Sequence, residues 1–488
     1  MAKRVAVIDI GSNSIRMVVY EKTSRFAFHI LYEAKSKVRL SQDAYKHQNN
    51  LQVLPMQRTF DALSDFLEVI SSYNVKKTFC VATSALRDAP NKKIFIKKVQ
   101  NELKLHIKVI DGEKEAYLGA VACANLLPKQ ENALSIDIGG GSTEFAYISG
   151  ENIQKSFSLE LGTVRLKELF FDSDLINEAI QYIDDKLSVL DENLTPTTLI
   201  GIGGTFRAIT NSLIKLDSYP LNKVHAYESN ISRFENQLYQ IMEANEDTLE
   251  SLHIKKSRFD IIKPGTLILQ RVLKKLSSLE KTVTSGSGVR EGVFLIDLLR
   301  NSKHKLPHNY NTSLRYLLDS YIYNTTHSNN LSKTSKKLFD LTYKHMNIPE
   351  NFKNELSIAS KLYPIGSSIH FFSKNRHSYY LIKSALEYGF THAQIMLIAT
   401  LVRYGKNKLP SQKHLEKYRE LLPNNYEINY LSYIISLSIA LLSHKPKNID
   451  FDLDFNDGYI DIKFEGSSHL SKEAISKLDE IQDLKVLY

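Results

Sequence analysis

The sequence lacks several features that would restrict its class. It contains two cysteines in 488 residues, Cys80 and Cys123, and each lies inside an apolar segment. Such thiols are typical of core packing in a reducing compartment, which excludes a disulfide scaffold. No apolar run reaches the roughly 18 residues expected of a membrane-spanning helix. The longest candidate, residues 430–442, is interrupted by three serines, so a buried helix is predicted there instead.

The chain also lacks the signatures of nucleic-acid-binding modules. It has no zinc-finger spacing, helix-turn-helix signature or RNA-binding aromatic motif, although its net charge of +9 would suit a polyanionic partner. We therefore expect no DNA or RNA partner and no membrane association. The first predicted strand begins at Val5, which leaves no room for a signal peptide and predicts a cytoplasmic protein.

An internal repeat is the most informative feature that is present. Residues 5–20, VAVIDIGSNSIRMVVY, align without a gap with residues 133–148, ALSIDIGGGSTEFAYI, 128 positions later. Each copy is predicted to form an apolar strand ending at a carboxylate, a turn of small residues and a second strand. Glycine and serine let backbone N–H groups converge on an anion. Two copies predict two related half-domains that clamp phosphate.

The copies differ at one chemically important position. Arg16 of the first copy is matched by Glu144 of the second. A cation suits phosphate, whereas a carboxylate suits a metal ion or a water molecule. The repeat therefore predicts two loops with different tasks.

Four glycine-containing segments are candidate phosphate-binding loops. Two are the turns of the repeat, one lies between the predicted strand 199–202 and the predicted helix 206–214, and one precedes the predicted helix 289–299. The N–H groups at a helix start favour phosphate. A single Gly-Gly pair is more typical of a structural turn, but four such segments favour a phosphate site. The residues are Gly11, Ser12, Asn13, Ser14, Gly139, Gly140, Gly141, Ser142, Thr143, Gly203, Gly204, Thr205 and the segment 285–288.

The predicted elements indicate three domains. Residues 1–127 alternate strands and helices, residues 128–305 restart that pattern, and residues 306–488 contain less glycine and more helical periodicity. We expect two mixed α/β lobes with a cleft between them, followed by an α-helical domain. The predicted strands are 5–10, 16–20, 26–34, 77–82 and 107–110. The predicted helices are 55–72, 92–103, 113–127, 289–299, 313–343, 351–363, 379–386, 393–404 and 431–442. We also expect a surface loop at 45–50 and a hairpin within 448–464.

Seven motifs occur in an order that resembles the exopolyphosphatase/guanosine pentaphosphatase (Ppx/GppA) family of the actin-like ATPase superfamily. They are DIGSNSIR (9–16), ATSALRDAPN (82–91), GEKEAYLGA (112–120), DIGGGSTE (137–144), LGTVRL (161–166), GIGGTFRA (201–208) and SGSGVREGVF (285–294). The resemblance covers about 1–300 and continues more weakly through about 310–410. It implies two actin-like (ribonuclease H-like) lobes and a C-terminal α-helical HD-like domain.

The resemblance also implies an activity. Members hydrolyse phosphoanhydrides with Mg²⁺, releasing terminal orthophosphate from inorganic polyphosphate or converting pppGpp to ppGpp. Those compounds would be its partners, and the family often forms homodimers. Two alternatives stay open: a catalytically idle sensor of polyphosphate or (p)ppGpp, and a kinase of the same fold. A kinase would need an adenosine pocket and an acceptor site, and the GEKEAYLGA match argues against it.

Carboxylates are the candidates for the chemistry. The resemblance assigns the catalytic base to Glu115, whose carboxylate would orient and deprotonate water. From the residues alone Glu113 is equally suitable, and either glutamate could merely complement the helix dipole. Asp137 and Glu144 resemble the metal-associated pair of the family, which would hold Mg²⁺. Asp9 is a third candidate for that role, and its alternative role is bonding the N–H groups of its own turn.

Two arginines are candidate phosphate ligands. Arg16 lies in the first loop, and Arg87 follows the predicted strand 77–82, where its guanidinium could bind phosphate through two N–H groups. A salt bridge from Arg87 to Asp88 is the alternative. Arg290 and Glu291 in the last motif are predicted to be a buried structural pair.

The C-terminal domain departs from the resemblance. Metal-dependent HD phosphohydrolases need a His-Asp doublet, and Tyr363-Pro364 occupies that position here. His370 and His377 remain, but two histidines without the doublet are poor evidence for a metal site. No second active site is predicted there. A basic groove for a long polyanion, with scattered surface lysines as its alternative, would be formed by Lys374, Arg376, Lys383, Arg403, Lys406 and Lys408.

Overall fold

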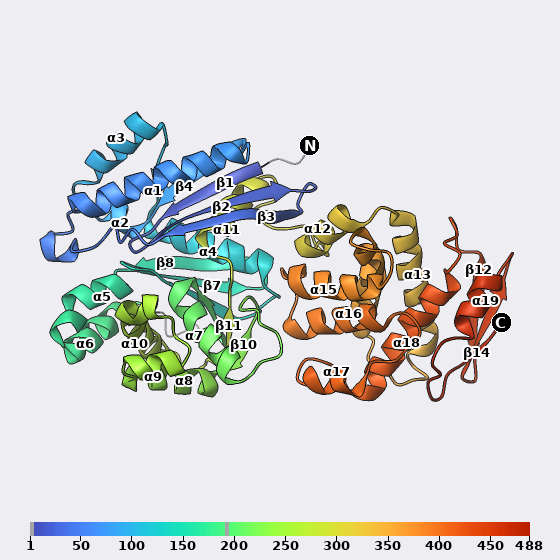
Figure 1. Cartoon of the computed structure of the whole chain (residues 1–488). Coiled ribbons are helices and arrows are strands. Elements are labelled where there is room, and N and C mark those ends of the chain that lie inside the picture. The colour runs from blue at the N-terminus through green and yellow to red at the C-terminus, as the bar shows by residue number, and fades with distance from the viewer. Residues whose placement is uncertain (1–3, 191–194) are drawn as a thin grey trace. The chain divides into compact units, whose positions relative to one another are not determined.

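The computed structural model of the chain describes residues 4–190 and 195–488. It divides into two compact units, Met1–Tyr310 and Asn311–Tyr488 (Figure 1). The first unit contains the two larger sheets, and the second is mainly helical. The limit expected at 305/306 lies close to the division between the units. The limit expected at 127/128 falls between α4 (Gly112–Leu126) and β6 (Ala133–Ile138).

The first sheet has five strands in the order β3-β2-β1-β4-β5. They are β1 (Arg4–Ile10), β2 (Ile15–Lys22), β3 (Phe28–Ser36), β4 (Lys77–Ala82) and β5 (Lys108–Val109). The first three strands form an antiparallel meander, whereas β4 runs parallel to β1, and β5 runs parallel to β4. The central strand β1 is buried on both faces, which its run of Val, Ala and Ile permits.

The second sheet repeats this topology. Its strand order is β10-β11-β9-β6-β7-β8. Strands β6, β7 and β8 correspond to β1, β2 and β3 of the first sheet, and β9 and β11 correspond to β4 and β5. The further bounds are β7 (Thr143–Ser149), β8 (Asn152–Leu159), β9 (Thr198–Ile202), β10 (Glu228–Asn230) and β11 (Lys281–Thr284). The prediction of two actin-like α/β lobes is therefore confirmed.

Two helices lie between the sheets of the first unit. Helix α4 packs against β7 and β8, α11 (Val289–Leu298) packs against β1, and the two helices contact each other (Figure 1). A Cβ on Gly292 would lie 2.0 Å from the Leu118 carbonyl oxygen, so glycine permits this close approach. The remaining helices of the unit are α1 (Val53–Ser72), α2 (Ser84–Arg87), α3 (Lys92–Leu103), α5 (Thr163–Leu169), α6 (Ile176–Leu187), α7 (Gly203–Leu216), α8 (Ile231–Glu243), α9 (Glu246–Ser251) and α10 (Phe259–Lys275).

Two local expectations for the first unit are corrected. The helix expected from residue 206 begins at Gly203, so two predicted loop glycines form its first turn. The loop expected at 45–50 contains a short 3-10 turn, Tyr45–His47. The expectation that Cys80 and Cys123 are buried free thiols is confirmed.

The second unit consists of helices and a small sheet. One helix was expected at 313–343, but two form, because the side chain of Asn324 accepts a hydrogen bond from the His327 N–H (3.0 Å) and starts a new helix. The hairpin expected within 448–464 is confirmed, and a third strand pairs with it. The elements are α12 (Thr312–Tyr321), α13 (Thr325–Thr342), α14 (Phe352–Leu362), α15 (Lys374–Ala385), α16 (His392–Tyr404), α17 (Gln412–Lys417), α18 (Asn425–Leu441), α19 (His469–Ile475), β12 (Phe451–Asn456), β13 (Tyr459–Phe464) and β14 (Lys485–Leu487).

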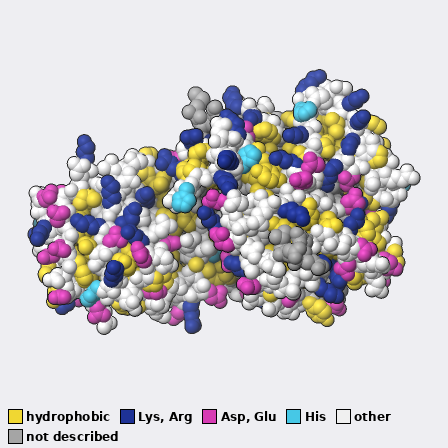
Figure 2. Space-filling view, turned by 180° about the vertical axis from the view of Figure 1, so that it is seen from behind, with side chains coloured by type: hydrophobic (Ala, Val, Ile, Leu, Met, Phe, Trp, Pro, Cys, Tyr) yellow, Lys and Arg dark blue, Asp and Glu magenta, His cyan; other side chains and the backbone are white. Residues whose placement is uncertain are grey.

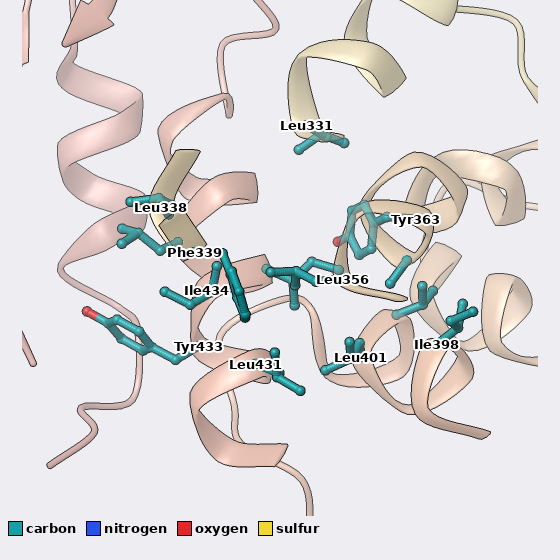
Figure 3. Packing of buried hydrophobic residues seen from close by; sticks show 14 of the residues in the cluster. Leu331, Leu338, Phe339, Leu356, Tyr363, Ile398, Leu401, Leu431, Tyr433 and Ile434 are labelled. Atoms are coloured by element: carbon teal, nitrogen blue, oxygen red, sulfur yellow. The ribbon is translucent and has the colours of Figure 1, made fainter. Parts of the chain in front are cut away.

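Apolar side chains from several helices fill the core of the second unit. Phe339, Leu356, Leu401 and Leu431 pack together there (Figure 3). Tyr363, at the position of the missing His-Asp doublet, is 3% exposed and belongs to this core. Nowhere in residues 4–190 and 195–488 do three or more His, Cys, Asp or Glu side chains gather into a set that could hold a metal ion.

The surface carries charges of both signs. On the face shown in Figure 2, basic and acidic side chains are interspersed. Three of the basic residues expected to form a groove, Lys374, Arg376 and Lys383, lie on α15, and Arg403 lies on α16. Among the described helices, none is both long and apolar enough to cross a membrane.

Candidate active site

The first sheet contributes a row of charged side chains at the end of its central strands. Asp9, Arg16 and Lys35 are cross-strand neighbours on β1, β2 and β3. Asp9 is partly buried, and its Oδ1 is fully buried without a hydrogen-bond partner among the described residues. Burial raises the pKa of Asp9 to about 6, although Arg290 and Arg16 oppose this effect. A buried carboxylate oxygen without a partner is costly, so this position is suited to a cation or water.

The second sheet places an acidic row at the equivalent position. Asp137 faces Glu144 across the β6–β7 hairpin, and Ser158 on β8 follows. The Ser158 hydroxyl donates to Glu144 Oε1 at 2.8 Å. Burial raises the pKa of both carboxylates, and the charge of Asp137 raises that of Glu144 further. Arg16 therefore lies on the side of the cleft formed by the first sheet, and Glu144 lies at the equivalent position on the side formed by the second sheet.

The two repeat turns approach each other closely. The Gly11 N–H donates to the Ser14 carbonyl (3.2 Å), and the Gly139 N–H donates to the Ser142 carbonyl (2.9 Å). A Cβ on Gly140 would lie 2.7 Å from the Cβ of Ser12, so the loops touch where the second has no side chain. This contact brings both candidate phosphate loops to one cleft.

The third loop lies where β9 meets α7. Gly203 has a φ of +82°, and a Cβ there would lie 2.3 Å from Asp137 Oδ1. A Cβ on Gly204 would lie 2.3 Å from an Arg258 guanidinium nitrogen. Glycine at these two positions therefore lets a carboxylate and a cation flank the start of α7, where free N–H groups favour an anion.

We expect Gly203→Ala to lower kcat by about 10-fold, because a misplaced reacting group is costly and the new methyl group must displace Asp137. Phosphate release and thermal unfolding of the variant would be measured together. Gly150→Ala is the matched control, since Gly150 also has a positive φ (+58°), in the turn between β7 and β8. Equal losses of activity in the two variants would contradict the role of the Gly203 position.

Glu115 lies in the first turn of α4, which Asp111 caps by accepting the Lys114 N–H at 2.7 Å. Its side chain is buried at the cleft, whereas Glu113 is exposed, so the geometry separates two residues that sequence could not. Burial raises the pKa of Glu115 well above its usual range, and Glu144 adds to this while Arg87 opposes it. Such a carboxylate is suited to accept a proton.

Arg87 holds this carboxylate in place. Its Nη1 donates to Glu115 Oε2 at 2.9 Å, and its Nη2 donates to the Ser142 hydroxyl at 3.3 Å. Its Nε also lies 3.4 Å from Asp88 Oδ1. The salt bridge with Asp88 that was the alternative is present, but the contact with Glu115 is shorter. Arg87 is therefore placed to orient Glu115 and the second loop.

The cleft, which has a cavity volume of about 170 Å³, contains basic residues that sequence reasoning missed. Lys35, Arg207 and Arg258 line it with Arg16, and in the described parts of the chain these three have no ion-pair partner. Burial and neighbouring cations lower the pKa of Lys35 to about 8 and that of Arg207 to about 10. Arg207 lies in the GIGGTFRA motif, which was the available signal. A bound anion would therefore stabilise this cluster of cations.

Some predicted residues do not reach the cleft. Thr143 is fully buried, and its hydroxyl donates to the Leu161 carbonyl at 2.6 Å. Gly141 faces the Tyr45 hydroxyl instead of the cleft, and in the segment 285–288 only Gly288 lines it. These positions were predicted because sequence does not distinguish the turn residues that face the cleft from those that face the protein interior.

Arg290 and Glu291 are buried, as expected, but they bind other partners. Arg290 Nη1 lies 2.6 Å from Glu33 Oε1. Glu291 accepts from the Tyr20 hydroxyl (2.6 Å) and the Gly288 N–H (2.7 Å). This pair therefore joins α11 to the first sheet and supports the cleft.

The donor set fits Mg²⁺. Asp9, Asp137 and Glu144 present carboxylate oxygens to the cleft, and Asp9 Oδ1 lacks a hydrogen-bond partner in the described structure. Mg²⁺ commonly uses one or two protein carboxylates and takes its other ligands from water and phosphate. One or two of these carboxylates, and not all three, would therefore hold the ion, because no described group of three such side chains could do so.

Comparison with known sequences agrees with this geometry. Residues 18–301 match the model of the Ppx/GppA phosphatase family, and residues 311–464 match Ppx/GppA phosphatase, domain III. The chain is 28% identical over 416 residues to a guanosine-5'-triphosphate,3'-diphosphate pyrophosphatase of Photobacterium profundum, covering 83% of this chain and 81% of that protein. It is 33% identical over 286 residues to a bifunctional 3-dehydroquinate synthase/phosphatase of Fusobacterium nucleatum, covering 55% of this chain but only 43% of that protein.

Solved structures show the same relationship. An exopolyphosphatase from Cytophaga hutchinsonii is 26% identical with a TM-score of 0.57, covering 62% of this chain and all of that one. The Aquifex aeolicus member of the Ppx/GppA family is 25% identical with a TM-score of 0.53, covering 62% of this chain and 99% of that one. The family model alone matches more than half of the sequence. The chain therefore belongs to the Ppx/GppA phosphatase family.

Proposed function

We propose that this phosphatase hydrolyses the terminal phosphoanhydride bond of inorganic polyphosphate or of pppGpp, with Mg²⁺ as cofactor. The observation that carries the proposal is the composition of one cleft. Glu115, a buried glutamate fixed by Arg87, lines the same cavity as an acidic row and a cluster of cations. Within the described residues, Lys35, Arg207 and Arg258 of that cluster have no ion-pair partner. The names of relatives support both substrates, since one is a guanosine-5'-triphosphate,3'-diphosphate pyrophosphatase and another an exopolyphosphatase.

The loops and the cations would bind the phosphates. The neutral donors would be N–H groups at the start of α7 and N–H groups of the repeat turns other than those of Gly11 and Gly139, which bond within their own turns. Arg16, Arg207 and Arg258 provide charged donors, and guanidinium groups bind phosphate oxygens in pairs. This set orients the chain of phosphates so that its terminal group lies toward Glu115.

Glu115 would act as the general base. A water oxygen attacks the terminal phosphorus in line while one of its protons passes to the Glu115 carboxylate. The bond from phosphorus to the bridging oxygen breaks, and that oxygen keeps the electron pair as the leaving phosphate. Arg87 holds one oxygen of the base, at 2.9 Å, so that the other is free for the water. One or two of the carboxylates Asp9, Asp137 and Glu144 would hold Mg²⁺, which would neutralise charge on the phosphate oxygens.

Phosphate release from long polyphosphate and from pppGpp, measured side by side with and without Mg²⁺, tests the proposal. We expect turnover of at least one substrate, and loss of that turnover in EDTA with recovery on adding Mg²⁺. A purified protein that releases no phosphate from either substrate would reject the proposed function. Parallel assays with ATP and a phosphate acceptor would reveal a kinase.

We expect Arg258→Ala to raise KM about 10-fold with a smaller effect on kcat, because its guanidinium would contact phosphates that do not react. Initial rates across substrate concentrations at fixed Mg²⁺ would measure this. Arg300→Ala is the control, since Arg300 follows α11 and its side chain is 67% exposed. An unchanged KM would remove Arg258 from the binding site.

A further inference from the structure

The LGTVRL motif, residues 161–166, lies beside the turn of the second repeat copy. Its second half begins helix α5, whose first N–H groups donate to carbonyls of that turn. The Thr163 N–H donates to the Gly139 carbonyl at 3.0 Å, and the Arg165 N–H donates to the Gly140 carbonyl at 3.1 Å. The N–H groups at a helix start lack partners within the helix, so the turn and α5 satisfy each other.

The side chain of Arg165 holds the next peptide group of the turn. Its Nε donates to the Gly141 carbonyl at 2.9 Å. None of the described peptide bonds is cis, and in a trans peptide the N–H points opposite to the carbonyl, so the Ser142 N–H points away from Arg165. Ser142 lines the cleft, and among the described residues its N–H donates to no backbone oxygen. Arg165 therefore orients an N–H group that an anion in the cleft can use.

The other end of the Arg165 guanidinium reaches the first lobe. Its Nη2 donates to Asp88 Oδ2 at 3.3 Å. The second oxygen of Asp88 lies 3.4 Å from Arg87 Nε, and Arg87 Nη1 in turn donates to Glu115 at 2.9 Å. The Tyr45 ring packs against the guanidinium, with its centroid 4.7 Å from Arg165 Cζ. Asp88 therefore lies between two arginines, one of which holds the candidate base.

The charge of Asp88 makes Arg165 important for Arg87. With both arginines present, one oxygen of Asp88 is paired with Arg165. Without Arg165, Asp88 would attract Arg87 alone and draw its guanidinium away from Glu115. Lysine would not replace arginine here, because its single ammonium group lacks the planar fork that donates to Gly141 and to Asp88 at once.

We propose that Arg165 is a positioning residue that fixes the Ser142 N–H and, by pairing with Asp88, keeps Arg87 on Glu115. The proposal rests on the proposed function, because it acts through the base of that reaction. Arg165 is buried and does not line the cleft, so it makes no contact with substrate. The groups that it holds surround the reacting phosphate, and its loss should therefore lower kcat more than it raises KM.

Arg165→Met in the full chain tests the proposal, because methionine fills the space but has neither charge nor N–H donors. We expect kcat to fall about 10- to 100-fold on whichever of tripolyphosphate and pppGpp the protein hydrolyses. The KM should stay within about three-fold of wild type. Arg165→Lys should give an intermediate kcat.

Arg271→Met is the matched control. Arg271 lies in the same lobe and donates twice to Asp184, at 2.7 and 2.5 Å, which joins α10 to α6 outside the cleft. We expect this variant to lose thermal stability but to keep kcat within about two-fold of wild type. Circular dichroism at the assay temperature would confirm that both variants are folded. A kcat for Arg165→Met no lower than that of the control would overturn the proposal and leave the proposed function intact.

A second substitution separates positioning from stability. Asp88→Asn, added to Arg165→Met, removes the charge that would attract Arg87. We expect the double variant to regain about 5- to 10-fold in kcat over Arg165→Met. A merely structural role of Arg165 predicts a gain in thermal stability without this gain in kcat. A double variant no faster than Arg165→Met would therefore overturn the proposal.

A crystal structure of Arg165→Met tests the geometry without an assay. We expect Arg87 to be paired with Asp88 and to lie beyond hydrogen-bond distance of Glu115. An Arg87 guanidinium still bonded to Glu115 would overturn the proposal. If the wild-type protein hydrolyses neither substrate, the proposed function fails, and this crystal structure still decides whether Arg165 keeps Arg87 on Glu115.

Discussion

Glu115→Gln is expected to lower kcat by about 10²- to 10⁴-fold while substrate still binds, because glutamine cannot take the proton of the attacking water. The carboxylate is buried at the cleft, and Arg87 fixes one of its oxygens at 2.9 Å. Glutamine is nearly isosteric, so the shape of the cleft should persist. Single-turnover rates and the Kd for a slowly hydrolysed substrate would be measured on the purified variant.

Glu113→Gln provides the matched control for this experiment. It makes the same change two residues away, in the same turn of α4, at an exposed side chain outside the cleft. We expect its activity to stay within about two-fold of wild type. A Glu115→Gln variant with activity within a few-fold of wild type would exclude Glu115 as the base.

Glu144→Ala and Arg16→Ala are expected to change different kinetic properties, the Mg²⁺ requirement and the KM, although the two residues occupy equivalent positions of the repeat. Glu144 belongs to the acidic row with Asp137, so its loss should raise the Mg²⁺ concentration for half-maximal activity by about 10- to 100-fold. Arg16 belongs to the cationic row with Lys35, so its loss should mainly raise KM for the phosphate substrate. Rates would be measured over a grid of Mg²⁺ and substrate concentrations.

The double variant adds a control for this division of labour. If the two residues serve different ligands, the shift in Mg²⁺ requirement and the shift in KM should combine independently. Identical Mg²⁺ dependence in the two single variants would show that the asymmetry of the repeat does not separate metal from phosphate binding.

Sequence was sufficient for the features that depend on neighbours along the chain. The repeat predicted two hairpins, and the register of a short hairpin follows from its turn, so Asp9 faces Arg16 and Asp137 faces Glu144. The glycine loops and the burial of Cys80 likewise followed from local pattern. The break before α13 was missed, because a helical pattern continues across the Asn324 cap.

The tertiary structure decided the contacts that join distant elements. Glu115 and Arg87 come from different helices, and only the fold shows that Arg87 contacts the Glu115 carboxylate. Arg258 is brought to the cleft by packing at the start of α10, and no motif marks it. Local pattern therefore determined which loops are candidates for binding an anion, because turns and hairpins are local. The charged side chains around those loops depend on long-range packing.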